Sequence, residues 1–271
     1  MRGMSAASLE GVLTRAESIV AQSAQGPDSV ARELFQIARV IDSSNQLIRL
    51  LSDPGRLSEI KVTALETLLR GKVSKEALAI ASDVVAQRWS EQDHVLDALE
   101  AAGMSALLNA ADAAGAGDAI EAELFQFSRL ITSTPELAAA FDRTRDDRAG
   151  RAAIVRSLLA DKANPVTTAL VEQAVTGNTE EKASRRVLSF AEFAADRRRR
   201  LMAVVTSAVA MNDQQQQRLA HILAAEFGQD VKMNFTVDPD VVGGMRVRVG
   251  DVVYDATILS RLSDARSRLT A

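Results

Sequence analysis

An internal repeat with an offset of 90 residues constrains the fold of this 271-residue chain more than any other feature. The match begins where Glu33-Leu34-Phe35-Gln36 recurs as Glu123-Leu124-Phe125-Gln126, and it needs no gap until after about residue 90. Further identical pairs are Arg39 and Arg129, Ile41 and Ile131, Ser43 and Ser133, Leu47 and Leu137, Lys72 and Lys162, and Val85 and Val175. A period this long exceeds the roughly 20 to 50 residues of stacked solenoid repeats, so we expect each copy to be a whole small domain.

Both copies are expected to be helical bundles. Ala and Leu abound while aromatic residues make up only 4% of the chain, a composition that favours closely packed helices over a β-sandwich. In the first copy, apolar residues recur at helical spacing from Val30 to Ile41, behind Asp28 and Ser29 as candidate helix caps. In the second copy, Asp118 and Glu121 have the spacing of a capping box.

Two prolines predict further helix starts in the second copy. Thr134-Pro135 and Asn164-Pro165 each place a capping side chain before a proline at the first helical position, where the missing N–H costs nothing. The last helix of this copy is expected from about Arg185 to Arg200, and the charge run at its end, 197–200, is expected to be solvated. Trp89 is expected to anchor the first bundle.

The periodicity changes after residue 200. Residues 202–209 are small and β-branched, which predicts a strand, and Asn212 can cap the helix that follows. Residues 231–237 and 245–249 alternate with the two-residue period of strands that bury one face, and the turn at 250–251 leads into a further strand at 252–254. A terminal helix is expected from Thr257.

These patterns predict a mainly α fold class, with two duplicated helical bundles followed by a small C-terminal α+β domain. The expected domains are residues 1–112 for the first copy, 113–200 for the second copy and 201–271 for the α+β domain.

Charge and composition exclude several classes of function. A net charge of -4 gives no overall attraction to phosphate backbones, so we expect no nucleic-acid partner. The chain has no Cys, which excludes disulfides and thiolate metal sites. Glu10 interrupts the first apolar stretch, which argues against an export signal. The run from Leu201 to Met211 is far shorter than the roughly 20 apolar residues that cross a bilayer.

The residues that could carry catalysis are isolated. His94 and His221 each stand alone on a predicted helix, without the second ligand at helical spacing that a zinc site uses. Gly115-Ala116-Gly117 resembles the start of a dinucleotide fingerprint, but Ile120 occupies the third glycine position and no strand precedes it. We therefore expect no catalytic residue, no metal site and no cofactor.

Residues 237–255 resemble the C-terminal signature of ATP synthase delta subunits, a family that includes the mitochondrial oligomycin sensitivity-conferring protein. The acidic turn, the glycine pair, the alternating basic strand, the Gly-Asp hairpin and the aspartate before the last helix are all present. The signature and interface candidates are Asp238, Gly243, Gly244, Arg246, Arg248, Gly250, Asp251, Asp255, Arg261 and Leu262. Ala256 stands where the family usually has glycine.

The resemblance covers about residues 118–271, and the extra N-terminal sequence is similar to the long form of delta subunits from actinobacteria. It implies a non-catalytic peripheral-stalk (stator) subunit of an F-type proton-translocating ATP synthase, present in one copy per complex. In this family the helical bundle receives the N-terminal helices of the α subunits, and the C-terminal domain holds the C-terminal ends of the b subunits.

The resemblance also implies a position on the cytoplasmic face of the cell membrane, with membrane contact only through the complex. Arg246 and Arg248, on the polar strand face, and the terminal helix from Thr257 to Leu269 are expected at or near the stalk-facing surface. Two alternatives stay open at this point. One is a general helix-binding adaptor unrelated to ATP synthesis, and the other is an enzyme housed in the α+β domain.

Overall fold

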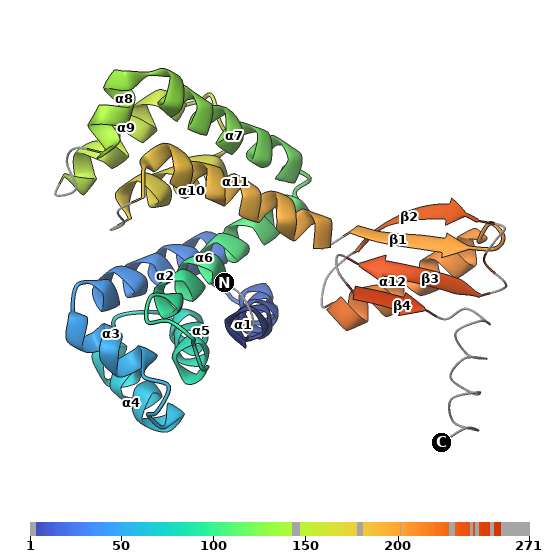
Figure 1. The fold of residues 1–271 in the computed structure, drawn as a ribbon, viewed down its shortest axis with the longest axis horizontal. Helices are drawn as coiled ribbons and strands as arrows, with labels where there is room; N and C mark the ends of the chain where they lie inside the picture. Colours follow the sequence, from blue (N-terminus) through green and yellow to red (C-terminus); the bar gives the residue numbers. More distant parts are fainter. Residues whose placement is uncertain are drawn as a thin grey trace. The chain divides into compact units, whose positions relative to one another are not determined.

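The computed structural model describes residues 4–142, 147–177, 181–200, 202–227, 231–238, 241, 244–249 and 252–255. The chain divides into two compact units, Met1–Glu192 and Phe193–Ala271. Figure 1 shows helices throughout the first unit and a small sheet with one helix in the second. The predicted mainly α fold class with a small C-terminal α+β part is confirmed, whereas the three predicted domain boundaries stay a prediction.

The helices of the first unit repeat with the offset of 90 that the sequence shows. Those of the first copy are α1 Met4–Ala21, α2 Pro27–Asp42, α3 Asn45–Ser52, α4 Ser58–Leu69, α5 Lys75–Ala86 and α6 His94–Ala113. Those of the second copy are α7 Gly117–Ser133, α8 Pro135–Asp142, α9 Arg148–Leu159, α10 Pro165–Thr176 and α11 Ala183–Arg200. The helices α8, α9 and α10 begin and end 90 residues after α3, α4 and α5. The two copies are therefore built on the same helix plan.

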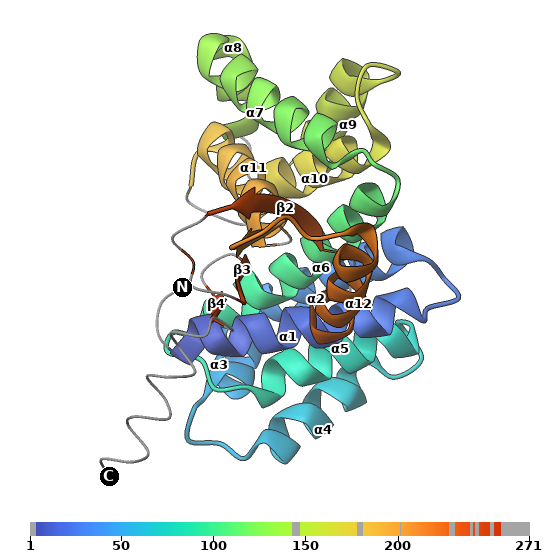
Figure 2. The ribbon, with the colours of Figure 1, turned by 90° about the vertical axis from the view of Figure 1, so that its right-hand side faces the viewer.

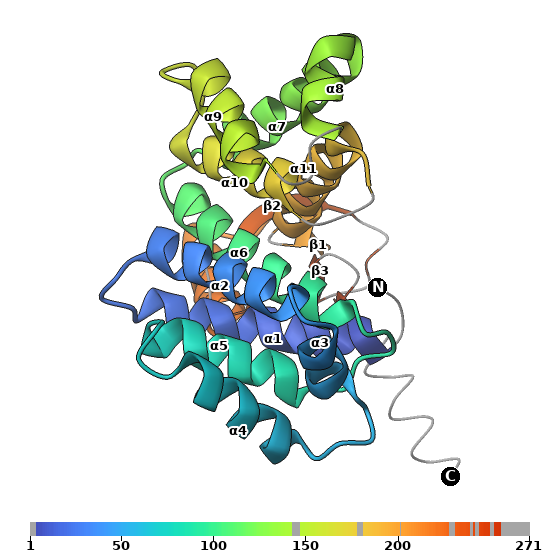
Figure 3. The ribbon, with the colours of Figure 1, turned by 90° about the vertical axis from the view of Figure 1, so that its left-hand side faces the viewer.

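Helix α6 belongs to both copies. It begins 90 residues after α1 and is the last helix of the first copy, as α11 is of the second. It packs against α1, α2, α3 and α5 on one side of the repeat and against α7 and α10 on the other (Figures 1 and 3). The residues of 101–108 are all buried, so α6 has no solvent-facing stripe there. A helical segment buried on all sides belongs to the core, and residues 101–108 of α6 form the common core of both bundles.

A half-buried glutamate links two helices at the same place in each copy. Oε2 of Glu33 on α2 accepts from the backbone N–H of Ser74 at 3.0 Å and from the Ser74 hydroxyl. Oε2 of Glu123 on α7 accepts from the backbone N–H of Asn164 at 3.0 Å and from the Thr167 hydroxyl. Each glutamate thus satisfies orphan donors at the N-terminus of the helix that follows, α5 or α10. The repeat has preserved a tertiary contact as well as helix lengths.

Two predicted helix caps are wrong. Gly26 is the N-cap of α2, with Pro27 next, so neither Asp28 nor Ser29 caps this helix. Ala116 is the N-cap of α7 without a side-chain hydrogen bond, so Asp118 lies inside the first turn. Acidic residues there still favour the helix through its dipole, which explains why the pattern resembles a cap.

Two other predicted caps are confirmed. Oδ1 of Asn164 accepts from the backbone N–H of Val166 at 2.9 Å, with the proline at the first helical position. Oδ1 of Asn212 accepts from the N–H of Gln215 at 2.9 Å, while Oε1 of Gln215 accepts from the N–H of Asn212 at 3.0 Å. This reciprocal pair is a capping box at the start of the single described helix of the second unit.

The second unit is a four-stranded mixed sheet with one described helix. Its elements are β1 Met202–Ser207, α12 Asp213–Phe227, β2 Lys232–Val237, β3 Met245–Val249 and β4 Val252–Asp255. The strand order is β2-β1-β3-β4, with β1 parallel to β2 and antiparallel to β3, and with β3 antiparallel to β4. The four predicted strands are confirmed, and the predicted helix from Thr257 lies outside the described residues.

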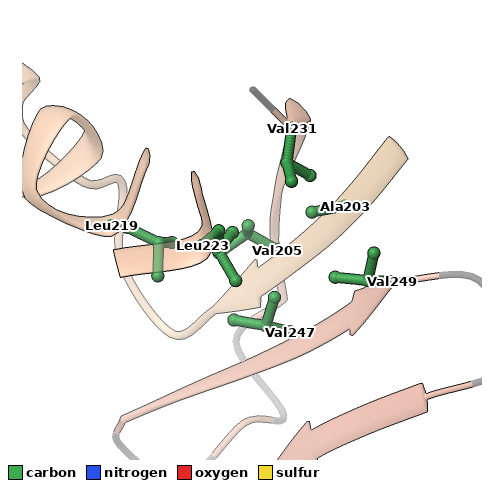
Figure 4. Packing of buried hydrophobic residues seen from close by; sticks show 7 residues of the cluster. All are labelled: Ala203, Val205, Leu219, Leu223, Val231, Val247 and Val249. Atoms are coloured by element: carbon green, nitrogen blue, oxygen red, sulfur yellow. The ribbon is translucent and has the colours of Figure 1, made fainter. Parts of the chain in front are cut away.

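The core of the second unit lies between α12 and one face of the sheet. Figure 4 shows the side chains of this cluster converging from the helix and the strands: Ala203, Val205, Leu219, Leu223, Val231, Val247 and Val249.

The first unit has the layered arrangement of a bundle, in which α1, α5 and α4 lie side by side (Figure 2).

Candidate interaction site

The outer face of the sheet presents the two signature arginines. Val247 and Val249 are buried in the core against α12, so the alternating residues Arg246 and Arg248 lie on the opposite face, and both are exposed. The register defines two rows of residues across this face: Asn234, Val204, Arg248 and Val253 in one, and Thr236, Thr206 and Arg246 in the other. Two positive charges in the middle of a sheet face, without a described element covering them, make a surface suited to an acidic partner.

The signature aspartate closes the end of the sheet. The backbone N–H of Asp238 donates to the carbonyl of Ser207 at 3.0 Å, and the N–H of Val241 donates to the Asp238 carbonyl at 3.1 Å. Gly244 has a φ of 83°, in the left-handed region that favours glycine. The acidic turn therefore holds β2 next to β1 and directs the chain into β3.

The structure accounts for part of the signature. Asp238 and Gly244 lie in the connection from β2 to β3, Arg246 and Arg248 lie on β3, and Asp255 ends β4. The remaining candidates lie outside the described residues: Gly243, Gly250, Asp251, Arg261 and Leu262. Nothing in the structure tests a contact of any of these residues with a partner, so the interface assignment stays a prediction.

Strand β2 is less buried than its alternation predicts. Val231 is 8% exposed and belongs to the core, but Phe235 is 37% and Val237 is 51% exposed. The expected single buried face is therefore wrong for the second half of the strand. The core cluster contains Val231 and the partly buried Met233 but neither of the two later residues, so it ends before they are reached.

The opposite edge of the sheet is also apolar, because Val253 and Tyr254 on β4 are 52% and 41% exposed. Edge strands with exposed apolar side chains invite further pairing or packing. Neither residue is among the interface candidates predicted from the sequence. What marks these residues is the position of β4 at the edge of the sheet, and the alternation of residues in the sequence does not reveal which strand is at an edge.

A polar network joins the two helical copies. Nη2 of Arg186 on α11 donates to both carboxylate oxygens of Glu100 on α6, at 2.5 and 2.7 Å. Nε2 of Gln173 on α10 donates to Glu100 Oε1 at 2.9 Å, and Nη1 of Arg39 on α2 donates to Gln173 Oε1 at 3.1 Å. The Arg186 guanidinium also lies 5.6 Å from the ring centroid of Phe190. Four helices from both copies thus meet in one network.

Two charged groups in or beside this network have shifted pKa values. Burial, and then the charge of Arg148, lower the pKa of Arg39. Desolvation, and then the Glu100 carboxylate, raise the pKa of Asp97, against smaller opposing effects of His94 and Arg186. Burial is the largest cause of both shifts, so they report the cost of holding charges among packed helices.

A buried basic side chain recurs at matched positions of the two copies. Lys61 on α4 is 2% exposed, its Nζ donates to the Gln87 carbonyl at 3.1 Å, and burial lowers its pKa. Arg151 on α9 is 5% exposed, and its Nη1 donates to the Phe141 carbonyl at 3.4 Å. Both side chains satisfy a carbonyl near the end of a helix, so they are structural groups.

His94, a candidate catalytic base, and Trp89, the expected anchor of the first bundle, both make contacts within that bundle. Nδ1 of His94 lies 3.0 Å from Oγ of Ser5 on α1, and Nε1 of the buried Trp89 donates to the Val84 carbonyl at 2.9 Å. Within the described ranges, no group of three or more His, Asp or Glu side chains is placed to bind a metal ion. No helix in the same part of the chain is long and apolar enough to cross a bilayer.

Comparison with known proteins identifies the family of the chain. The family model for the ATP synthase delta (OSCP) subunit matches residues 104–269, a stretch that begins inside α6. An ATP synthase subunit delta from Beutenbergia cavernae is 37% identical over 269 residues, which cover 99% of each chain. Proteins of the same name from Acidothermus cellulolyticus and Streptomyces coelicolor are 38% and 36% identical and cover 99% or more of both chains.

Proposed function

This chain belongs to the family of ATP synthase delta (OSCP) subunits and is a peripheral-stalk subunit of an F-type ATP synthase, and we propose that it binds both the α subunits and the b subunits. The observation that carries the proposal is the similarity to delta subunits along the whole chain, which spans the helical copies and the sheet alike. The helix-binding adaptor is not favoured, because relatives over the full length have the stalk subunit's name.

The two helical bundles receive the N-terminal helices of α subunits. An amphipathic helix binds a bundle by burying its apolar face in a groove, with side chains at i, i+3, i+4 and i+7 as anchors. Nanomolar affinity corresponds to about 12 kcal/mol, which a groove of this kind supplies from buried apolar surface and a few hydrogen bonds. The duplicated helix plan supports this role, because it repeats the same arrangement of amphipathic helices in one chain.

The small sheet holds the C-terminal ends of the b subunits. Support comes from the exposed Arg246 and Arg248 on its outer face and from the apolar edge at Val253 and Tyr254. Apolar edge contacts provide affinity, while the arginines provide orientation and selectivity for acidic segments of the stalk. One copy of the chain per complex, on the cytoplasmic face, completes the proposed arrangement.

The work of this subunit is mechanical. A stator must transmit torque between its two interfaces without deforming, and it needs no bond-breaking step of its own. The shared helix α6 and the network around Glu100 support this role, because they bind the two helical copies into one core. The proposal therefore includes no catalytic site.

Cross-linking mass spectrometry of the intact ATP synthase tests this function. Lys72 and Lys162 are exposed, lie 90 residues apart and occupy the same turn in the two copies, so an amine-reactive reagent reads both bundles under equal conditions. We expect cross-links from one or both to α subunits, and from Lys232, the lysine of the sheet region, to b subunits. Purification with soluble proteins other than ATP synthase subunits would overturn the proposal and support the adaptor.

A further inference from the structure

Matched positions on α2 and α7 differ in whether anything covers them. Phe35 on α2 is 5% exposed, whereas Phe125, 90 residues later on α7, is 49% exposed. A lone exposed apolar side chain is ordinary on a protein surface. Phe125 differs because the same fold shows, at its counterpart, what kind of surface covers this face.

The cover of α2 has two defined features. A Cβ built on Gly103 of α6 would lie 2.5 Å from Cε1 of Phe35, so the ring occupies space that only a glycine leaves free. One turn further along α2, Nη1 of Arg39 donates to Oε1 of Gln173 on α10 at 3.1 Å. The covering surface therefore supplies a residue without a side chain under the ring and an oxygen acceptor for the guanidinium.

The matched face of α7 has the same two groups without that cover. Ala122, Phe125 and Arg129 follow one another at i, i+3 and i+7, so they lie on one stripe, and all three are exposed. Arg129 has no hydrogen-bond or ion-pair partner among the residues that the structure describes. The sequence places Phe193 at the position that matches Gly103, so the second copy does not repeat the glycine that leaves room for the ring.

We infer that this α7 stripe, Ala122, Phe125 and Arg129, is a docking surface for an amphipathic helix of another subunit. That helix places a glycine or alanine against the Phe125 ring and a carboxylate or amide side chain against the Arg129 guanidinium, as α6 and α10 do for α2. The surface rests on the proposed function only for the source of the helix, which is another subunit of the same complex. It adds one packed aromatic anchor and one directed hydrogen bond to the contacts of the second bundle.

Photo-cross-linking in the assembled complex locates the occupant. The probe p-benzoylphenylalanine replaces Phe125 in one variant and Leu57, which is 67% exposed on the first copy, in the control. We expect residue 125 to form an adduct with a helix of another subunit, at or next to a glycine or alanine. An adduct with a second copy of this chain, or no adduct beyond that of the control, would overturn the inference.

A rebinding assay measures the contribution of the stripe. Phe125→Glu is expected to weaken binding of the purified chain to a complex stripped of it by about 10-fold. Leu130→Glu is the matched control, because Leu130 is 43% exposed and its counterpart Val40 is also exposed, at 40%, so the repeat predicts no cover there. Both residues are on the surface of α7, and equal thermal midpoints of the two variants exclude a folding defect.

The two proposals fail in different ways. If the unaltered chain does not rebind the stripped complex, the peripheral-stalk contacts proposed above are wrong. If the unaltered chain rebinds and Phe125→Glu binds as tightly as Leu130→Glu, only the α7 docking surface is wrong.

Discussion

The guanidinium of Arg186 bridges both carboxylate oxygens of Glu100 through a single nitrogen, between a helix that both copies share and the last helix of the second copy. The two side chains are only 17% and 12% exposed. Gln173 and Arg39 extend the contact to α10 and α2, so the network reaches both bundles. Because the pair is largely desolvated, removing one partner leaves the other charge without compensation.

Glu100→Gln should therefore destabilise the first unit by about 2–3 kcal/mol, since it leaves the Arg186 charge partly buried and unpaired. Chemical denaturation followed by circular dichroism measures the loss. Arg185→Gln is the control, because Arg185 is 62% exposed and its 3.8 Å pair with Glu181 contributes little. Equal stability of Glu100→Gln and the control would show that the network does not bind the copies together.

Two helical glycines should respond in opposite directions to alanine. Gly103→Ala would bring its Cβ to 2.5 Å from Phe35 and should cost about 1–3 kcal/mol through overpacking. Gly11→Ala meets only the end of the flexible Arg15 side chain, at 3.2 Å, and should stabilise α1 by about 0.5–1 kcal/mol. Thermal unfolding of both variants checks the contrast. Destabilisation of both would mean that the helix interior, and not the Phe35 contact, sets the result.

The repeat made most of the helical fold predictable. Identical residues recur with an offset of 90, and the bounds of three pairs of helices differ by the same 90 residues. The helices match because helix length depends on local caps and periodicity. The sharing of α6 was not predictable in the same way. Residues 101–108 of α6 show no amphipathic stripe in the sequence. Only the tertiary packing shows that helices of both bundles contact this one helix.

The sequence predicts a candidate site well when the residues of the site are close together in the chain. Arg246 and Arg248 alternate with buried valines, so their shared face follows from the strand period. Glu100 and Arg186 stand 86 residues apart with no pattern linking them, and Phe125 looks like any apolar position of an amphipathic helix. The pairing of Glu100 with Arg186, and the exposure of Phe125 where its counterpart Phe35 is buried, can be seen only in the folded structure.

The two matched glutamates should make equal and independent contributions to stability. Glu33→Gln and Glu123→Gln each weaken charged hydrogen bonds to a helix N-terminus and should each cost about 1–2 kcal/mol. Their effects should add in the double variant, because they act on different helices. Denaturant unfolding of the three variants checks this, with Glu66→Gln on α4 as the control. A double variant no worse than either single one would contradict equivalent roles.

Asp97→Asn should change how stability depends on pH. The folded-state pKa of Asp97 is raised, so the folded chain binds this proton more tightly than the unfolded chain does. The stability that Asp97 gains from this tighter proton binding is fully present at pH values below its pKa in the unfolded chain. This stability is lost as the pH rises through its pKa in the folded chain. We expect the variant to melt up to about 3 °C higher at pH 7, a small gain because the side chain is exposed, with the gap closing towards about pH 3.5. If the difference in melting temperature grew as the pH is lowered, the pKa of Asp97 would be lowered in the folded chain and not raised.

Charge reversal on the outer face of the sheet should impair assembly of the stalk. Arg246→Glu with Arg248→Glu replaces two exposed positive charges in the middle of that face by two negative ones, while Val247 and Val249 keep the core intact. Like charges facing an acidic partner cost several kcal/mol at an interface, so recovery of b subunits with the tagged chain should fall by about 10-fold or more. Arg218→Glu on the exposed side of α12 controls for net charge and should leave recovery unchanged. Because the buried valines of β3 are unchanged, circular dichroism should show that the second unit of the variant still folds. Full recovery of b subunits with both reversals in place would move the stalk contact to another surface of this unit.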